Sequence, residues 1–155
     1  MDAKNYALWL LGQRAYSEKR LCDKLRRKKY SETDIVSVIK YCLEHRFLDD
    51  LEYAKSFIRT RLALRPRGQR VLRLELLKRG IDDGTIEEAL SSNELNQTSE
   101  VELARRLVEQ KRFQYAGLEK QIRNRRLFAL LARRGFSVTT IKEVLNELAT
   151  GKADA

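Results

Sequence analysis

The sequence is poor in the residues that form tight turns, metal sites and disulfides. One proline and seven glycines in 155 residues are too few for the many turns of a sheet protein. A single histidine, His45, and two cysteines form no Cys/His cluster with the spacing of a zinc site. Cys22 and Cys42 fall within helical patterns, so we expect free thiols in a reducing cytoplasm. These shortages predict an all-α protein that holds no metal or other cofactor.

The motifs of common enzymes are also missing. The chain has no phosphate-binding Gly-rich loop, no Gly-x-Ser-x-Gly sequence and no His-Glu-x-x-His sequence. Asp49, Asp50 and Glu52 form an acidic group that suggests a divalent metal, but helix capping explains it better: one aspartate caps the following helix and the other favours its positive end. The sequence therefore predicts a protein without catalytic activity.

Membrane and export signals are likewise not found. The chain has no signal-peptide-like start, and no apolar run approaches the roughly 18 residues of a membrane span. We expect a cytoplasmic protein with no membrane partner.

Basic charge is plentiful. The chain has 32 basic and 22 acidic residues, a formal charge of +10 and a pI near 9.8. Hydrophobic residues make up 43% and charged residues 35%, which is typical of a soluble, folded chain. An anionic partner is the natural expectation, although charge alone sets only steering and non-specific binding.

A block of five apolar residues, spaced by four, five, five and four, occurs three times. The copies are Leu21, Leu25, Tyr30, Ile35 and Ile39; Leu72, Leu76, Ile81, Ile86 and Leu90; and Leu127, Leu131, Phe136, Ile141 and Leu145. This spacing predicts two helices joined by a tight turn, with the apolar face of each in a shared core. An Ala-x-x-apolar-apolar pattern at Ala7, Ala54 and Ala104 adds a helix before each block.

The chain is therefore predicted to be an elongated array of three tandem three-helix repeats, nine helices in all, built from helix-turn-helix-like units. We place the repeats at 4–48, 49–92 and 99–149, with a polar linker at 92–98 and a tail at 150–155.

Helix boundary signals agree with this plan. Ser31 and Ser99 are each followed three residues later by an acidic residue, as in a capping box. Gly80 and Gly135 follow basic residues at predicted helix ends, where a left-handed residue is favoured. The corresponding position in the first repeat holds Lys29. The first of these three turns is thus predicted less directly than the other two.

Charge is divided unequally between the helices of each repeat. The second helices, taken as 17–29, 65–79 and 118–134, each carry +5, from 7 − 2, 6 − 1 and 6 − 1. The third helices, taken as 31–45, 81–95 and 137–148, carry −2, −5 and −1. In a DNA-reading helix-turn-helix the helix after the turn enters the major groove, where acidic side chains would meet phosphates. A base-reading repressor is therefore disfavoured.

The basic second helices predict a positive stripe that contacts phosphates or an acidic protein groove, because guanidinium groups pair with either. The alternative is a solvated face that only keeps the protein soluble. Stacking of single-stranded bases is weakly indicated, since few aromatic residues lie nearby. The candidate contact residues are Arg26, Arg27, Lys28, Lys29, Arg65, Arg67, Arg70, Arg73, Arg123, Arg125, Arg126, Arg133 and Arg134.

Several short motifs resemble the RecX family of bacterial regulatory proteins. The most specific is Phe47-Leu48-Asp49-Asp50 followed by Tyr53-Ala54. The others are Tyr16-Ser17-Glu18, Arg67-Gly68 leading to Glu75-Leu76, Lys78-Arg79-Gly80-Ile81 and, more loosely, Arg134-Gly135-Phe136. The matches run from about Tyr6 to Leu148.

The resemblance implies three tandem three-helix repeats and a regulatory role toward the RecA recombinase. Members of that family bind the RecA–DNA filament and most often inhibit its ATPase activity, strand exchange and extension, in DNA repair and the SOS response. RecA is then the expected partner, with single- or double-stranded DNA as a further one, and we expect a monomer. A non-specific DNA-binding repeat protein is the alternative function, and a protein scaffold without a role in recombination is a third.

Overall fold

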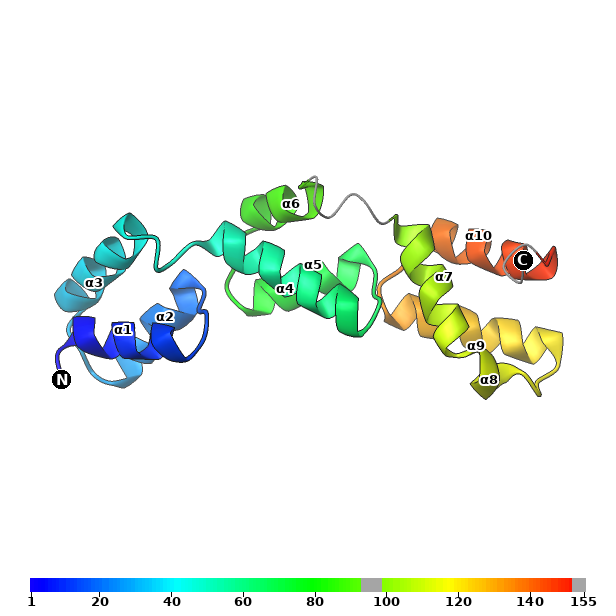
Figure 1. Ribbon diagram of the computed structural model, residues 1–155, viewed down its shortest axis with the longest axis horizontal. Coiled ribbons are helices and arrows are strands. Elements are labelled where there is room, and N and C mark those ends of the chain that lie inside the picture. The colour runs from blue at the N-terminus through cyan, green and yellow to red at the C-terminus, as the bar shows by residue number, and fades with distance from the viewer. Residues whose placement is uncertain (93–98, 152–155) are drawn as a thin grey trace. The chain divides into compact units, whose positions relative to one another are not determined.

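The structure, a computed structural model, describes residues 1–92 and 99–151 (Figure 1). These residues form ten helices and no strand. The helices are α1 (Ala3–Gln13), α2 (Glu18–Arg27), α3 (Glu32–Glu44), α4 (Asp50–Leu64), α5 (Gln69–Lys78), α6 (Asp83–Ser91), α7 (Glu100–Gln110), α8 (Arg112–Tyr115), α9 (Lys120–Arg133) and α10 (Val138–Ala149). The predicted all-α class is confirmed. The nine predicted helices correspond to α1–α7, α9 and α10, and the single-turn α8 is additional.

Within the described ranges, no helix combines the length and the apolar character that crossing a bilayer requires.

The chain divides into two compact units. Unit 1 comprises residues 1–57 and 75–89, and unit 2 comprises residues 58–74 and the described residues from 90 onward. Both α4 and α5 contribute one end to each unit, so the second repeat is shared between them. The repeat limits 4–48, 49–92 and 99–149 stay a prediction, and most of the predicted linker and tail lie outside the described residues.

The core of unit 1 is built from the first copy of the apolar block. Leu21, Leu25, Ile35 and Ile39 are buried between α1, α2 and α3. Tyr30 is only half-buried, because its hydroxyl reaches the surface and donates to the Met1 carbonyl at 2.9 Å. The five positions therefore form the predicted core, with a tyrosine closing its edge.

The third copy of the block forms the core of unit 2, where α7, α9 and α10 contact one another (Figure 1). Leu127, Leu131, Phe136 and Ile141 are buried and Leu145 is half-buried. All five apolar positions of the second copy are buried as well.

The two cysteines are free thiols, as predicted. Cys42 is fully buried in the core of unit 1, and Cys22 is half-buried at its edge. Burial raises the pKa of both thiols.

The predicted helix boundaries are confirmed at most positions. Ser31 accepts a hydrogen bond from the Asp34 amide and Ser99 from the Glu102 amide, each at 3.1 Å. Gly80 and Gly135 have φ of 86° and 87°, in the left-handed region that favours glycine. Lys29 adopts the same conformation, with φ of 64°. The first turn therefore has the geometry of the other two, although its residue carries a side chain.

Candidate functional site: two basic repeat junctions

In unit 1 the N-terminus of α2 contacts the second repeat. The Ser17 hydroxyl donates to the carbonyl of Arg79, which follows α5, at 2.5 Å. The Glu18 amide, at the first position of α2, donates to Asp50 Oδ1 at 2.9 Å. Since Ser17 and Glu18 lie in the first repeat and the other two residues in the second, we call this contact the first junction. It joins a helix N-terminus to a helix C-terminus and to a carboxylate.

Unit 2 contains the same contact one repeat further along the chain. The Gly68 amide donates to the carbonyl of Arg134 at 2.6 Å, and the Gln69 amide donates to Glu100 Oε1 at 3.3 Å. Gly68 and Gln69 occupy the positions of Ser17 and Glu18 in their repeat, 51 residues later. This second junction joins the second repeat to the third at equivalent positions, but the donor to the carbonyl is the Gly68 backbone amide, where the first junction uses the Ser17 hydroxyl.

Asp49 and Asp50 accept hydrogen bonds from the backbones of two different helices. Asp49 caps α4, as predicted, by accepting from the Glu52 amide at 3.1 Å. Asp50 lies in the first turn of α4, at the positive end of that helix as predicted, and it also accepts from the first backbone amide of α2, which the sequence did not indicate. Burial raises the pKa of Asp50, the Glu18 amide lowers it, and negative charge on Asp82 and Asp49 raises it further. The Asp49 carboxylate thus caps a helix, and the Asp50 carboxylate connects the first repeat to the second.

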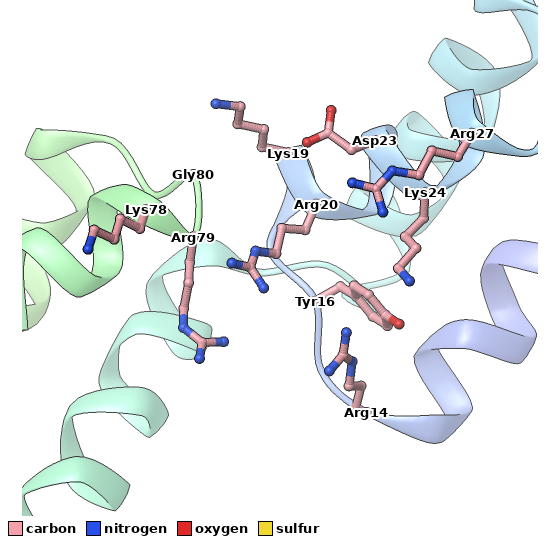
Figure 2. Close-up of a pocket in the computed structure, with 10 residues that line it drawn as sticks. All are labelled: Arg14, Tyr16, Lys19, Arg20, Asp23, Lys24, Arg27, Lys78, Arg79 and Gly80. Carbon is pink, nitrogen blue, oxygen red and sulfur yellow. The ribbon is translucent and has the colours of Figure 1, made fainter.

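Basic side chains surround the first junction. They line a cavity of about 410 Å³ next to α2 and the C-terminal end of α5 (Figure 2). The lining residues are Arg14, Tyr16, Lys19, Arg20, Asp23, Lys24, Arg27, Lys78, Arg79 and Gly80. Figure 2 shows the head groups of Arg14 and Lys24 beside Tyr16, whereas Arg20 extends to the side of Arg79 and Lys78 points away from Tyr16. Of the predicted contact residues, only Arg27 belongs to this cavity.

Arginines surround the second junction in the same way. Arg65, Arg67 and Arg133 lie close enough to Arg134 for their charge to lower its pKa, although burial of Arg134 is the larger cause. Arg70 contacts the end of α9, where its guanidinium donates to the Ala132 carbonyl at 3.3 Å. The structure therefore brings together five of the predicted contact residues, which come from two separate stretches of sequence.

These five arginines differ in exposure. Arg65, Arg70 and Arg133 are exposed, and Arg134 is half-buried. Arg67 is 9% exposed, and its Nε donates to the Arg65 carbonyl at 3.1 Å. Arg67 is thus part of the interior of the second junction, which the sequence did not indicate.

The first predicted cluster, 26–29, is partly engaged within the protein. Arg26 donates to both carboxylate oxygens of Glu32, at 2.8 and 3.3 Å, and lies 3.6 Å from Asp23. The Lys28 ammonium lies 5.3 Å from the centre of the Tyr6 ring. Lys29 closes α2 and is exposed. Of the four, Arg27 and Lys29 make no ion pair or cation–π contact among the described residues.

The other predicted residues are spread along α5 and α9. Arg73 is half-buried on α5, and Arg125 and Arg126 are exposed on α9. Arg123 is half-buried, and its Nε is buried without a hydrogen-bond partner among the described residues. The third predicted cluster is thus divided, because Arg133 and Arg134 join the second junction while Arg123, Arg125 and Arg126 lie nearer the start of α9.

Six basic residues of the first junction were missed by the search for charge-rich runs. They are Arg14, Lys19, Arg20, Lys24, Lys78 and Arg79. An alignment of the repeats would have found some of them, because a shift of 51 residues places Arg14 on Arg65 and Lys19 on Arg70. Likewise Lys78 and Arg79, before Gly80, match Arg133 and Arg134, before Gly135.

Family models of three consecutive three-helix domains match the three repeats. They are described as the first, second and third three-helix domains of RecX, and they match residues 3–42, 49–90 and 98–145. The chain belongs to the RecX family. The resemblance seen in the sequence is thereby confirmed.

Relatives in the RecX family cover nearly the whole chain. Regulatory protein RecX from Vibrio vulnificus (strain CMCP6) is 34% identical over 147 residues, which span 95% of this chain and 93% of the relative. Regulatory protein RecX from Chlorobium phaeobacteroides (strain BS1) is 31% identical over 146 residues, which span 94% and 93%. The crystal structure of RecX from Lactobacillus salivarius has a TM-score of 0.83, with 29% identity, and the match covers 96% of this chain and 95% of that one.

These RecX relatives are named as regulatory proteins.

Proposed function

We propose that this protein binds the RecA–DNA filament and inhibits ATP hydrolysis, strand exchange and filament extension, as a monomer in the cytoplasm. Membership of a family of regulatory proteins supports a binding role. Several contacts carried by one chain strengthen one another through effective concentration, so no single contact has to be strong. Regulation of DNA repair and the SOS response would follow from control of the filament.

The observation that carries the proposal is the cluster of arginines at the second junction. Burial is the larger cause of the lowered pKa of Arg134, and the positive charges of Arg65, Arg67 and Arg133 lower it further, because like charges held together in a fold repel one another. An anionic partner relieves the repulsion, and guanidinium groups bind carboxylates and phosphates in the same bidentate geometry. An acidic groove of a protein filament would supply carboxylates to these arginines, and DNA phosphates would supply further anionic partners.

Non-specific DNA binding without a protein partner is the second candidate function. The basic junctions favour it, because phosphate contacts require only positive charge. Such binding weakens steeply with salt, with a log–log slope of about −0.7 to −0.9 for each phosphate contacted. Ion pairs with a protein groove are also screened by salt, but the groove lacks the condensed counterions of DNA, so binding to it weakens less steeply.

Co-sedimentation separates the two functions. The protein is centrifuged with RecA–DNA filaments, with the same DNA alone and with RecA alone, at two salt concentrations. We expect it to sediment with the filaments at a salt concentration that releases it from bare DNA. Equal retention on bare DNA would favour the second function, and no retention in any sample would contradict both.

The triple substitution R65A/R70A/R133A removes the exposed arginines of the second junction and tests whether this junction contacts the filament. It leaves out Arg67, because that side chain is buried and its loss would disturb the fold. We expect filament binding to weaken roughly tenfold or more, since each charge-assisted hydrogen bond contributes about 1.5–3 kcal/mol.

The matched control is K40A/K120A/K142A, which removes the same charge from exposed positions outside the predicted contacts. The control should bind filaments as the unsubstituted protein does. Equal weakening in both variants would show that net charge alone is responsible.

A further inference from the structure

The cavity at the first junction carries a large excess of positive charge. Seven of its lining residues are basic, namely Arg14, Lys19, Arg20, Lys24, Arg27, Lys78 and Arg79, and Asp23 is the one acid. The Asp23 carboxylate lies 3.6 Å from Arg26, which is outside the lining, so part of its charge is already balanced. The basic lining is therefore weakly compensated by the protein.

Three of these cations stand on one face of α2. Arg20, Lys24 and Arg27 are spaced by four and three residues, which places them on successive turns of the same side. Arg20 and Lys24 are half-buried, and none of the three forms an ion pair with any residue that the structure describes. Like charges at this spacing destabilise a helix, so an anion bound among them would stabilise it.

The cavity wall is held by specific contacts. The Ser17 hydroxyl fixes the Arg79 backbone at 2.5 Å, and a Cβ at Gly80 would lie 2.7 Å from Lys19 Cβ. The Arg79 guanidinium donates to the Tyr53 hydroxyl at 2.9 Å and lies 4.7 Å from the Phe57 ring centre. Arg79 is therefore held in place before any ligand arrives, which lowers the entropic cost of binding at that side of the cavity.

We propose that this cavity binds a short phosphate chain, such as inorganic tripolyphosphate or the triphosphate of a nucleotide. Its volume of about 410 Å³ suits a small ligand, and its basic lining suits a highly charged anion. Tyr16 is 7% exposed and lies under the Arg14 guanidinium at 4.8 Å, so it offers no free ring face to a nucleobase. The phosphate groups are therefore the recognised part. This site goes beyond the proposed function and does not depend on it.

Isothermal titration calorimetry of the full chain with sodium tripolyphosphate, ATP and adenosine tests this site, with sulfate at matched ionic strength as a reference. We expect saturable one-to-one binding of tripolyphosphate and ATP that is tighter than that of sulfate, and no binding of adenosine. If tripolyphosphate binds and ATP does not, the ligand is a free phosphate chain and not a nucleotide. Tripolyphosphate binding no tighter than sulfate would overturn the proposal.

The variant R20A/K24A should bind tripolyphosphate roughly tenfold or more weakly, because it removes two central donors to the anion. The exchange R20K/K24R keeps the charge and should retain most of the affinity. The control K40A/K142A removes the same charge outside the cavity and should bind normally. Equal losses of affinity in R20A/K24A and in the control would also overturn the proposal. A short single-stranded oligonucleotide is titrated as well. If it binds, loses affinity in R20A/K24A, and tripolyphosphate does not bind, the proposal is likewise overturned.

Discussion

Gly68 occupies a position at the second junction where no side chain fits. A Cβ built on it would lie 2.6 Å from the Phe136 nitrogen and closer still to the carbonyl group of Gly135. These neighbours are backbone atoms, which cannot rotate away as a flexible side chain does. The hydrogen bond from the Gly68 amide to the Arg134 carbonyl, at 2.6 Å, requires this close approach.

The substitution Gly68→Ala should therefore lower the free energy of unfolding by about 1–3 kcal/mol, as overpacking does in a well-packed site. Chemical denaturation followed by circular dichroism measures the change. Gly117→Ala is the control, because nothing lies within 4 Å of a Cβ at Gly117. An equal effect of the two substitutions would mean that the close contact at the second junction contributes nothing.

Asp50 gives unit 1 a predictable response to pH. Its pKa is raised in the folded protein, chiefly by burial, from an ordinary value of 3.8. Between 3.8 and the raised pKa the folded state binds more protons than the unfolded state, so stability from this group falls as pH rises through that window.

Asp50→Asn removes this titration but keeps an oxygen that accepts from the Glu18 amide. The stability of the variant relative to the unsubstituted protein should therefore rise from pH 3.8 to neutrality. Urea denaturation of both proteins across this range measures the difference. A difference that is constant, or that falls with pH, would show that burial of the charge is not the dominant cause.

At the scale of the helix, the N-caps of α2 and α3 have the same local geometry but different surroundings. Ser17 accepts from the Arg20 amide at 3.3 Å, and Ser31 accepts from the Asp34 amide at 3.1 Å. Ser17 is fully buried and also donates to the Arg79 carbonyl of the next repeat, whereas Ser31 is exposed. Only the first of these caps connects two repeats.

Ser31→Ala should cost about 1 kcal/mol, the usual value of a lost cap. Ser17→Ala should cost about 2–4 kcal/mol, because it also removes the part-buried hydrogen bond to the Arg79 carbonyl. Thermal and urea unfolding of the two variants provide the comparison. Equal costs would contradict a stabilising role of the first junction.

Helices and turns were predictable because their signals are local. The spacing of Leu21, Leu25, Ile35 and Ile39, repeated twice, contains both the helical period and the core-facing side. Contacts between repeats were not predictable in the same way. Nothing near Asp50 in the sequence shows that its carboxylate accepts a hydrogen bond from the Glu18 amide, and nothing near Arg67 shows that this arginine is buried.

At the scale of the whole chain, a search for basic runs found the arginines of the second junction but missed most cations of the first. Charge in unit 1 is contributed singly by Arg14, by the face of α2 and by the end of α5, so no single run reveals the cavity. The contact of the α2 N-terminus with the second repeat brings these basic residues together. The equivalence of the two junctions follows from the repeat itself, which the sequence shows clearly. Whether the basic residues form one stripe along the chain stays a prediction.

We propose that this member of the RecX family restrains RecA on DNA. The most direct measurement is the rate of single-stranded-DNA-dependent ATP hydrolysis by RecA as the protein is added at a fixed RecA concentration. We expect the rate to fall with increasing protein, and to fall at roughly tenfold higher concentration for R65A/R70A/R133A, in proportion to the weaker filament binding. A rate that stays constant at concentrations where the protein sediments with the filaments would contradict the claim.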